Sequence, residues 1–249
     1  MGKLDGKVAL VTGGGSGIGR GIARGLALEG ARTVLAARGE KRLNETAKEI
    51  QALGGTSVAI PADVTSESQV KALFERTMEL FQRLDILVNN AGAVDGGPLD
   101  ELPAETWDKV IAVNLRGPFL CTRSAMQIMK CQGGGRILNI GSISAQRPRF
   151  NAGPYATSKF GIWGLTMVTA LEGREHGISA CCLHPGNVDV ESTAEEVGAV
   201  SGILGYEAEP KMQVAEIAEV AVLMACLPPH INMLESIVLP VKQAYLARG

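Results

Sequence analysis

Short apolar runs alternate with longer segments of helical period along the whole chain. The runs predict strands at Val8 to Val11, Thr33 to Ala37, Ser57 to Pro61, Ile86 to Val88, Arg136 to Ile140, Ser179 to Leu183 and Ser236 to Leu239. The segments between them predict helices near Gly17 to Glu29, then up to about Leu53, and at Glu67 to Phe81, Trp107 to Lys130, Tyr155 to His176 and Val214 to Cys226. Strands this apolar must be covered on both faces. The pattern therefore predicts a doubly wound parallel sheet in a three-layer α/β/α sandwich.

The length of the chain fits one large hydrophobic core. With 249 residues and no linker or internal repeat, we expect a single domain over residues 1–249. The segment at about 188–211 differs from the rest, because it mixes acidic residues and glycines with the apolar Ile203, Leu204 and Tyr206. We interpret it as a lid or substrate loop, with an ordinary surface loop as the alternative.

Charge and composition narrow the range of partners. The formal net charge of -2, with acids and bases interspersed, favours neither nucleic acid nor a membrane surface as partner. The first residues lack the apolar stretch of a signal peptide, which predicts a cytoplasmic protein. Five cysteines, an odd number, are typical of reduced, packed thiols. His176, His184 and His230 have no metal-ligand spacing, so no metal site is predicted.

A glycine-rich turn directly follows the first predicted strand and opens the first predicted helix. Gly13 would permit the sharp turn, Gly17 would let the backbone approach a pyrophosphate, and Gly19 would allow the helix to pack closely on the sheet. The N-terminus of the helix would attract the phosphates. The predicted dinucleotide contacts in this turn are Gly13, Gly15, Ser16, Gly17, Ile18 and Gly19.

The residues that follow the second and third predicted strands bear on the choice of cofactor. Where an NAD-binding unit places an acid for the ribose, this chain has Ala37 and then Arg38. A guanidinium pairs well with a 2′-phosphate, so NADP(H) is preferred and NAD(H) is the alternative. Arg38 could also be a solvated cation. Asp63 could accept a bond from the adenine amino group, with helix capping as the competing explanation.

Tyr155 and Lys159 carry the most specific chemistry in the chain. They are spaced i,i+4, so on a helix both side chains leave the same face. An ammonium beside a phenol stabilises the phenolate, so the phenol can exchange a proton near neutral pH. Ser142 lies thirteen positions before Tyr155 and offers a second hydroxyl. This set is typical of hydride transfer to or from a nicotinamide.

Taken together, these motifs resemble the short-chain dehydrogenase/reductase family, in its single-domain Rossmann-like type. The resemblance runs nearly end to end. It rests on the segment from Thr12 to Gly19, Asp63-Val64, Asn89 to Gly92, Asn114, Ser142, the segment from Tyr155 to Lys159, and Pro185-Gly186.

The resemblance implies a role for each matching residue. Tyr155 would exchange a proton with the substrate oxygen, Lys159 would also bond the nicotinamide ribose, and Ser142, rather than Ser144, would donate to the substrate oxygen. Asn114 would hold a water that relays protons from Lys159, although an asparagine can instead bond a distorted helical turn. Further cofactor contacts would be Val64, Asn90, Ala91, Gly92, Tyr155, Lys159, Pro185, Gly186 and Val188, and substrate contacts Ser142, Ser144, Gln146, Tyr155 and Gly186.

Two features depart from the family pattern, and the resemblance also implies oligomers. Val190 stands where a threonine commonly contacts the carboxamide, and the C-terminus lacks a glycine-rich end. The family pairs its long helices between subunits, and the segment from Phe160 to Leu171 is apolar nearly all round. A homotetramer is expected, with a dimer second.

The predicted activity is NADP(H)-dependent interconversion of a ketone or aldehyde and an alcohol. Three alternatives stay open: an NAD(H)-dependent secondary alcohol or sugar-alcohol dehydrogenase, a 3-oxoacyl-thioester reductase of the same family, and a non-catalytic dinucleotide-binding protein. Docking of an acidic carrier protein requires a basic surface, and Lys130, Arg136 and His176 make only a small basic patch. A small or medium-sized carbonyl substrate is therefore favoured.

Overall fold

Seven parallel strands form the sheet of this protein, which we describe from a computed structural model over residues 2–190 and 209–246. Their spatial order is β3-β2-β1-β4-β5-β6-β9. The strands are β1 (Val8–Thr12), β2 (Arg32–Ala37), β3 (Ser57–Pro61), β4 (Ile86–Asn89), β5 (Gly135–Ile140), β6 (Ile178–Pro185) and β9 (Glu235–Val238). The order reverses between β1 and β4, which places a ligand crevice at the carboxyl ends of these two strands.

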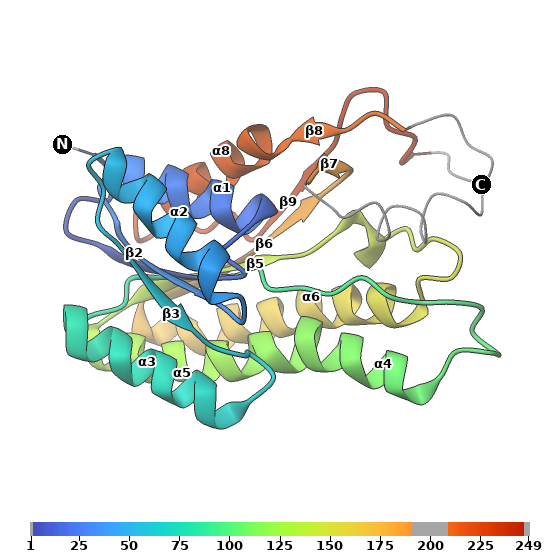
Figure 1. The fold of residues 1–249 in the computed structure, drawn as a ribbon, viewed down its shortest axis with the longest axis horizontal. Helices are drawn as coiled ribbons and strands as arrows, with labels where there is room; N and C mark the ends of the chain where they lie inside the picture. Colours follow the sequence, from blue (N-terminus) through green and yellow to red (C-terminus); the bar gives the residue numbers. More distant parts are fainter. Residues whose placement is uncertain (1, 191–208, 247–249) are drawn as a thin grey trace.

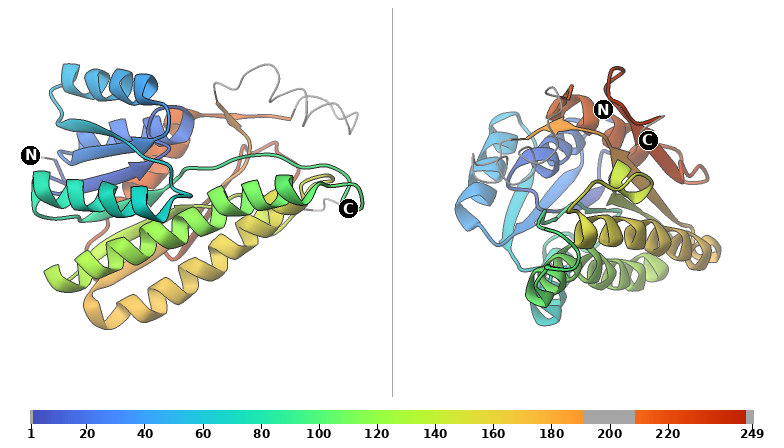
Figure 2. Two further views of the ribbon diagram at one scale, coloured as in Figure 1. Left: turned by 60° about the horizontal axis from the view of Figure 1, so that its bottom comes forward. Right: turned by 90° about the vertical axis from the view of Figure 1, so that its right-hand side faces the viewer.

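Helices cover both faces of the sheet (Figures 1 and 2). The helices are α1 (Gly17–Leu28), α2 (Glu40–Ala52), α3 (Glu67–Phe81), α4 (Ala104–Ile111), α5 (Gly117–Gln132), α6 (Gly153–Gly173) and α8 (Val214–Ala225). α1, α2 and α8 lie on one face, and α3, α5 and α6 lie on the other. The predicted doubly wound α/β sandwich is confirmed.

The core is divided into two halves by the sheet. On one side Ile22 and Leu26 of α1 pack with Leu43 of α2, with Ile217 of α8 and with the residues of β1 and β5 that point to this face of the sheet. On the other side Leu73 of α3 and Leu120 of α5 pack against alternate residues of the same strands. Because β1 is buried along its whole length, the glycine turn that follows it is anchored to the rigid centre of the molecule.

One predicted helix differs from its expected form. The segment expected as a single helix at Trp107 to Lys130 contains a π-helical turn at Ala112–Arg116 between α4 and α5. Pro118 explains part of this break, because it has no N–H to donate to the carbonyl of Asn114 four residues earlier. The turn carries Asn114, so the irregularity falls on a predicted site residue.

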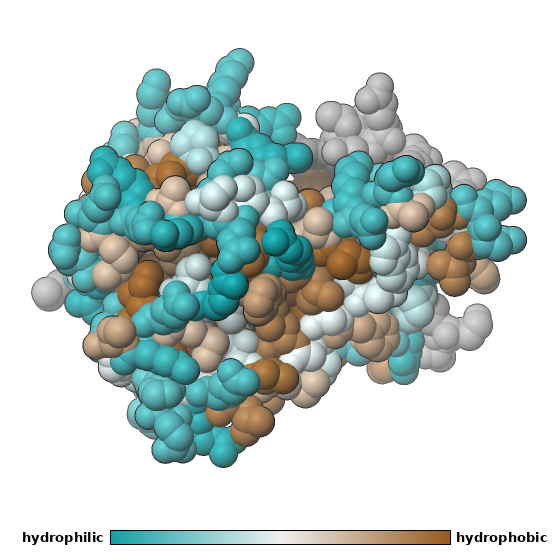
Figure 3. Space-filling model, turned by 90° about the horizontal axis from the view of Figure 1, so that it is seen from below, coloured by the Kyte–Doolittle hydropathy of each residue, from teal (hydrophilic) through white to brown (hydrophobic). Residues whose placement is uncertain are grey.

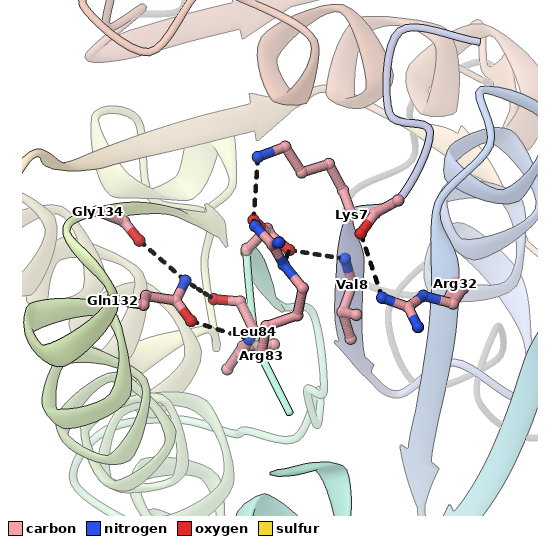
Figure 4. Close-up of polar contacts among 9 residues, drawn as sticks. Lys7, Val8, Arg32, Arg83, Leu84, Gln132 and Gly134 are labelled. Carbon is pink, nitrogen blue, oxygen red and sulfur yellow. Dashed lines mark hydrogen bonds and ion pairs between the residues drawn. The ribbon is translucent and has the colours of Figure 1, made fainter. Parts of the chain in front are cut away.

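A cluster of charged side chains around the buried Asp85 lies at the opposite end of the strands (Figure 4). Asp85 accepts hydrogen bonds from the backbone N–H of Val8 at 2.9 Å, from Lys7 at 3.1 Å and from both arms of Arg83. Burial alone would raise the pKa of Asp85, but the bonds from Arg83, Val8 and Lys7 outweigh it and hold this pKa below its usual range. Asp85 thereby joins the start of β1 to the start of β4.

A small parallel pair of strands, β7 (Val188–Asp189) and β8 (Met212–Gln213), lies beside the sheet. The predicted lid at 188–211 lies largely outside the described residues. Within the described ranges, none of the helices combines the length and the apolar character needed to cross a bilayer.

Candidate active site

The glycine turn connects β1 to α1 with two residues in the left-handed region. Gly13 has φ of 68° and Gly17 has φ of 50°, conformations that side chains rarely adopt. A Cβ on Gly19 would overlap the carbonyl oxygen of Gly13 and the side-chain amide of Asn90. The close approach expected at Gly19 therefore occurs against the turn itself and against Asn90, which follows β4.

The N-terminus of α1 is suited to an anion. Ser16 stands at the N-cap without a side-chain capping bond, and the first turn of α1 contains no acidic residue. The first backbone N–H groups of the helix thus face outward, where a phosphate would be stabilised by them and by the helix dipole. Val190 also lies here, since a Cβ built on Gly17 would be 3.4 Å from Val190 Cγ1. The turn fits the pyrophosphate of a dinucleotide.

Thr12 and Asn90 connect the carboxyl ends of β1 and β4. Thr12 Oγ1 accepts from the backbone N–H of Asn90 at 3.0 Å and from that of Ala91 at 3.1 Å. The Asn90 side-chain amide donates to the Thr12 carbonyl at 3.0 Å. These bonds hold Asn90 and Ala91, two of the predicted cofactor contacts, against the end of β1.

Arg38 and Asp63 lie at the ends of neighbouring strands. Arg38 follows β2 and is exposed, and no acidic side chain occupies position 37 or 38. Asp63 Oδ1 accepts from Thr65 N at 2.9 Å and Thr65 Oγ1 at 2.8 Å. Burial by itself would raise the pKa of Asp63. The bonds from Thr65 and the charge of nearby Arg38 outweigh burial and hold this pKa below its usual range, so Asp63 is ionised at neutral pH. The N-cap of α3 is Ser66, so the capping explanation for Asp63 is wrong.

Tyr155 and Lys159 lie together in the first turns of α6, as their spacing predicts. Lys159 Nζ is 5.5 Å from the centroid of the Tyr155 ring and donates to the carbonyl of Ile140, at the end of β5, at 2.8 Å. Lys159 is only 6% exposed, so its charge acts in a poorly solvated place. The ammonium has two further hydrogens, which can donate to other groups.

Ser142 lies just beyond β5 in extended backbone and caps the short helical turn Ile143–Ala145. Its Oγ accepts the backbone N–H of Ser144 at 3.1 Å. That contact uses a lone pair and leaves the hydroxyl proton free to donate to a substrate oxygen. Ser144 is buried and lies two residues after Ser142, consistent with a supporting position.

Asn114 joins the π-helical turn to two other parts of the site. Its Oδ1 accepts the N–H of Ala93 at 2.7 Å, and its Nδ2 donates to the Ala93 carbonyl at 2.9 Å and to Ser158 Oγ at 3.1 Å. The side chain thus bonds protein groups on every side that the structure describes. These bonds occupy both hydrogens of the Asn114 side-chain amide, so the amide has no N–H left to donate to a water. The proton relay through a water at Asn114 stays a prediction.

The remaining predicted substrate contacts face the C-terminal segment. Gly186 donates its N–H to the carbonyl of Val238 at 2.7 Å. A Cβ at Gly186 would overlap the ends of the Gln243 and Leu239 side chains, so a larger residue there would have to displace them. Gln243 Oε1 also accepts the N–H of Asn187 at 3.0 Å. Gln146 donates to Glu235 Oε1 at 2.9 Å.

Sequence reasoning missed three residues around this site, namely His184, Glu235 and Gln243. His184 lies on β6, fully buried, with its Nδ1 against the main chain of Ser142. None of the three belongs to a motif, and His184 lies far from Ser142 in sequence. The one sequence signal for His184 was its position directly before the Pro185-Gly186 motif.

Two hollows among the described residues lie away from Ser142. One, of about 940 Å³, lies between α1 and α8 and is lined by Gly17, Arg20, Val190 and Val214 among others. It reaches the glycine turn at one end and includes neither Ser142 nor Tyr155. The chemistry, and not the size of a hollow, therefore defines the candidate site.

Comparison with known proteins places the chain in a family. A family model described as short chain dehydrogenase matches residues 7–199. The chain belongs to the short-chain dehydrogenase/reductase family, and it is an oxidoreductase of that family.

Individual relatives agree with this assignment. A short chain dehydrogenase/reductase named astE, of Aspergillus oryzae, is 43% identical over 201 residues, which cover 78% of this chain and 77% of the relative. A structure of actinorhodin polyketide ketoreductase with NADPH is similar with a TM-score of 0.87 and 34% identity, over 96% of this chain and 98% of that one. A metagenomic short-chain oxidoreductase in complex with NADP has a TM-score of 0.83 and 33% identity over 96% and 98% of the two chains.

Proposed function

We propose that this protein interconverts a ketone or aldehyde and an alcohol with NADP(H), using Ser142, Tyr155, Lys159 and Asn114. The observation that carries the proposal is the placement of Lys159, a buried cation 5.5 Å from the ring of Tyr155. A cation at this distance stabilises a phenolate more strongly in a poorly solvated site than in water. Two of the similar structures hold NADPH or NADP, which supports the same cofactor here.

Each residue of the set has a distinct task in the proposed reaction. In the reducing direction the Tyr155 hydroxyl gives its proton to the carbonyl oxygen, and in the oxidising direction the phenolate accepts it back. Ser142 Oγ donates a hydrogen bond to the same oxygen, where negative charge develops. Lys159 holds the phenolate by charge. The nicotinamide, when bound, supplies or accepts the hydride.

The residues that would hold the dinucleotide come from the ends of five strands, β1, β2, β3, β4 and β6. Gly13, Gly15, Ser16, Gly17, Ile18 and Gly19 would face the pyrophosphate, and Arg38 would pair with the 2′-phosphate. Asp63 and Val64 would face the adenine. Asn90, Ala91 and Gly92 would line the ribose side, and Pro185, Gly186 and Val188 would face the nicotinamide.

The decisive experiment is Tyr155→Phe. The ring still packs, but the proton is gone, so we expect turnover of a carbonyl panel, followed by loss of NADPH absorbance, to fall by about a thousandfold or more. NADPH binding, followed by fluorescence, should stay within a few-fold. Tyr245→Phe is the matched control, because Tyr245 lies in the C-terminal segment with its ring 5.9 Å from Arg147. Retained turnover in Tyr155→Phe would refute the assignment.

We also propose that the enzyme is a homo-oligomer, a tetramer first and a dimer second, formed through α5 and α6. Apolar side chains gather on this face (Figure 3). Among them Phe119 is 45%, Phe160 50% and Leu171 63% exposed, and exposed apolar side chains gathered in one area are typical of an interaction surface. Leu171→Glu should lower the mass measured by light scattering, whereas Leu53→Glu at the end of α2 should not. An unchanged mass in Leu171→Glu would contradict this interface.

A further inference from the structure

His184 occupies a buried place directly behind Ser142. Its Nδ1 lies 2.9 Å from the Ser142 carbonyl oxygen and 3.3 Å from the Ser142 backbone nitrogen. Its Nε2 lies 3.4 Å from Glu235 Oε1 on the adjacent edge strand β9. A Cβ on Gly141 would collide with the imidazole, so the glycine at that position makes room for the ring. The ring therefore has a fixed position between Ser142 and Glu235.

The two contacts of Nδ1 cannot exist at the same time. An Nδ1 that carries a proton donates to the Ser142 carbonyl, whereas an Nδ1 with a lone pair accepts the Ser142 N–H. Nε2 makes no hydrogen bond among the described residues, but the Glu235 carboxylate 3.4 Å away favours a proton on Nε2 by its charge. A neutral ring thus accepts from Ser142 N–H, and a protonated ring donates to Ser142 C=O.

The surroundings of His184 determine where it titrates. Burial lowers the pKa of His184 below its usual range, the contacts with Ser142 and Glu235 raise it in part, and the ammonium of Lys159 lowers it again. Cys182 also lies beside the ring, and burial raises the pKa of its thiol to about 12, so this thiol stays neutral. Trp163 packs edge-on against the ring at 6.0 Å and carries no charge.

We propose that His184 is a positioning residue for Ser142. Glu235 holds a proton on Nε2 of the neutral ring, whose Nδ1 accepts the N–H of Ser142. When Nδ1 gains a second proton, it donates to the carbonyl of Ser142 instead. The exchange moves the serine whose hydroxyl faces the substrate oxygen. This inference rests on the proposed role of Ser142. It makes turnover depend on a group that touches neither substrate nor cofactor.

The first test needs no activity. The chain has three histidines, so ¹⁵N-histidine labelling gives three imidazole signal sets, and His176→Asn and His230→Asn identify that of His184 by elimination. We expect the neutral His184 ring to carry its proton on Nε2, and to become doubly protonated on the acid side while the protein stays folded. Glu235→Gln should lower the midpoint by about one pH unit, a tenfold change in proton affinity. A neutral ring protonated on Nδ1, or a ring that gains no proton before unfolding, overturns the proposal.

The second test measures turnover. The kcat of the wild type should change through the same midpoint with KM nearly constant, and Glu235→Gln should move that change to lower pH. Glu172→Gln, an exposed change of equal charge on α6, should leave the profile in place. His184→Asn keeps an N–H at the place of Nδ1 but cannot titrate, so the change of kcat through the His184 midpoint should disappear. A wild-type kcat with no transition at the midpoint overturns the positioning role, while activity retained in Tyr155→Phe would instead refute the proposed function.

Discussion

Asn114 and Ser158 are joined by a hydrogen bond of 3.1 Å from the asparagine Nδ2 to the serine Oγ. Ser158 Oγ in turn donates to the carbonyl of Tyr155 at 2.6 Å. The π-helical turn that carries Asn114 is thereby bonded to the turn of α6 that carries Tyr155. Since Asn114 also bonds both main-chain groups of Ala93, one side chain fixes the loop after β4 and the start of α6 together.

Asn114→Ala should weaken both the fold and the reaction. It leaves the half-buried main-chain groups of Ala93 without these partners, which should lower the free energy of unfolding by about 1 to 2 kcal/mol. Misplacement of Tyr155 should reduce kcat by about tenfold or more. Urea unfolding and steady-state kinetics measure the two effects. Ser158→Ala is the control, because it retains the bonds to Ala93 and should destabilise the fold less. Unchanged stability in Asn114→Ala would show that the side chain is not the connector described here.

Arg38→Asp should change the preferred cofactor. A guanidinium that bonds the 2′-phosphate contributes about 1.5 to 3 kcal/mol, so its replacement by a carboxylate should raise the KM for NADPH by about ten- to a hundredfold. The carboxylate can accept from a ribose hydroxyl, so the KM for NADH should fall.

Lys48→Asp provides the control for this change. It makes the same change of charge on the exposed side of α2 and should leave the selectivity for cofactor unchanged. If both variants shift the selectivity equally, long-range charge would account for the effect and Arg38 would have no specific contact. If neither variant shifts it, Arg38 does not recognise the phosphate.

Asp85→Asn should destabilise the protein at neutral pH. The pKa of Asp85 is lowered in the folded state, so its contribution is present above the unfolded pKa and is lost as pH falls through the folded value. We expect a loss of about 2 kcal/mol at pH 7. The difference from the wild type should shrink as the pH falls into the acid range, as followed by urea unfolding.

Asp95→Asn serves as the comparison for Asp85→Asn. Asp95 pairs with Lys109 on the surface, with side chains 40% and 65% exposed, so its loss should change stability by less than about 0.5 kcal/mol. A large effect at Asp95, or a difference at Asp85 that does not depend on pH, would contradict the assignment of Asp85 as the ion that connects the starts of β1 and β4.

Local sequence patterns were sufficient for most of the fold. The apolar runs gave all seven strands of the sheet with their ends displaced by no more than two residues, because strands buried on both faces are continuous apolar segments. The π-helical turn at Ala112–Arg116 was not predicted. Pro118 accounts for part of it, and the rest comes from the bonds of Asn114 to Ala93 and Ser158, which belong to segments distant in sequence.

The site shows the same division. The i,i+4 spacing of Tyr155 and Lys159 fixes their proximity within one helix, and the glycines after β1 fix the shape of the turn, so the sequence by itself determined these parts and the family. The places of His184, Glu235 and Gln243 follow from which strands lie side by side at β5, β6 and β9. Only the tertiary structure decided where these three residues lie. Contacts between neighbouring parallel strands depend on strand order and register, and a local segment of sequence determines neither.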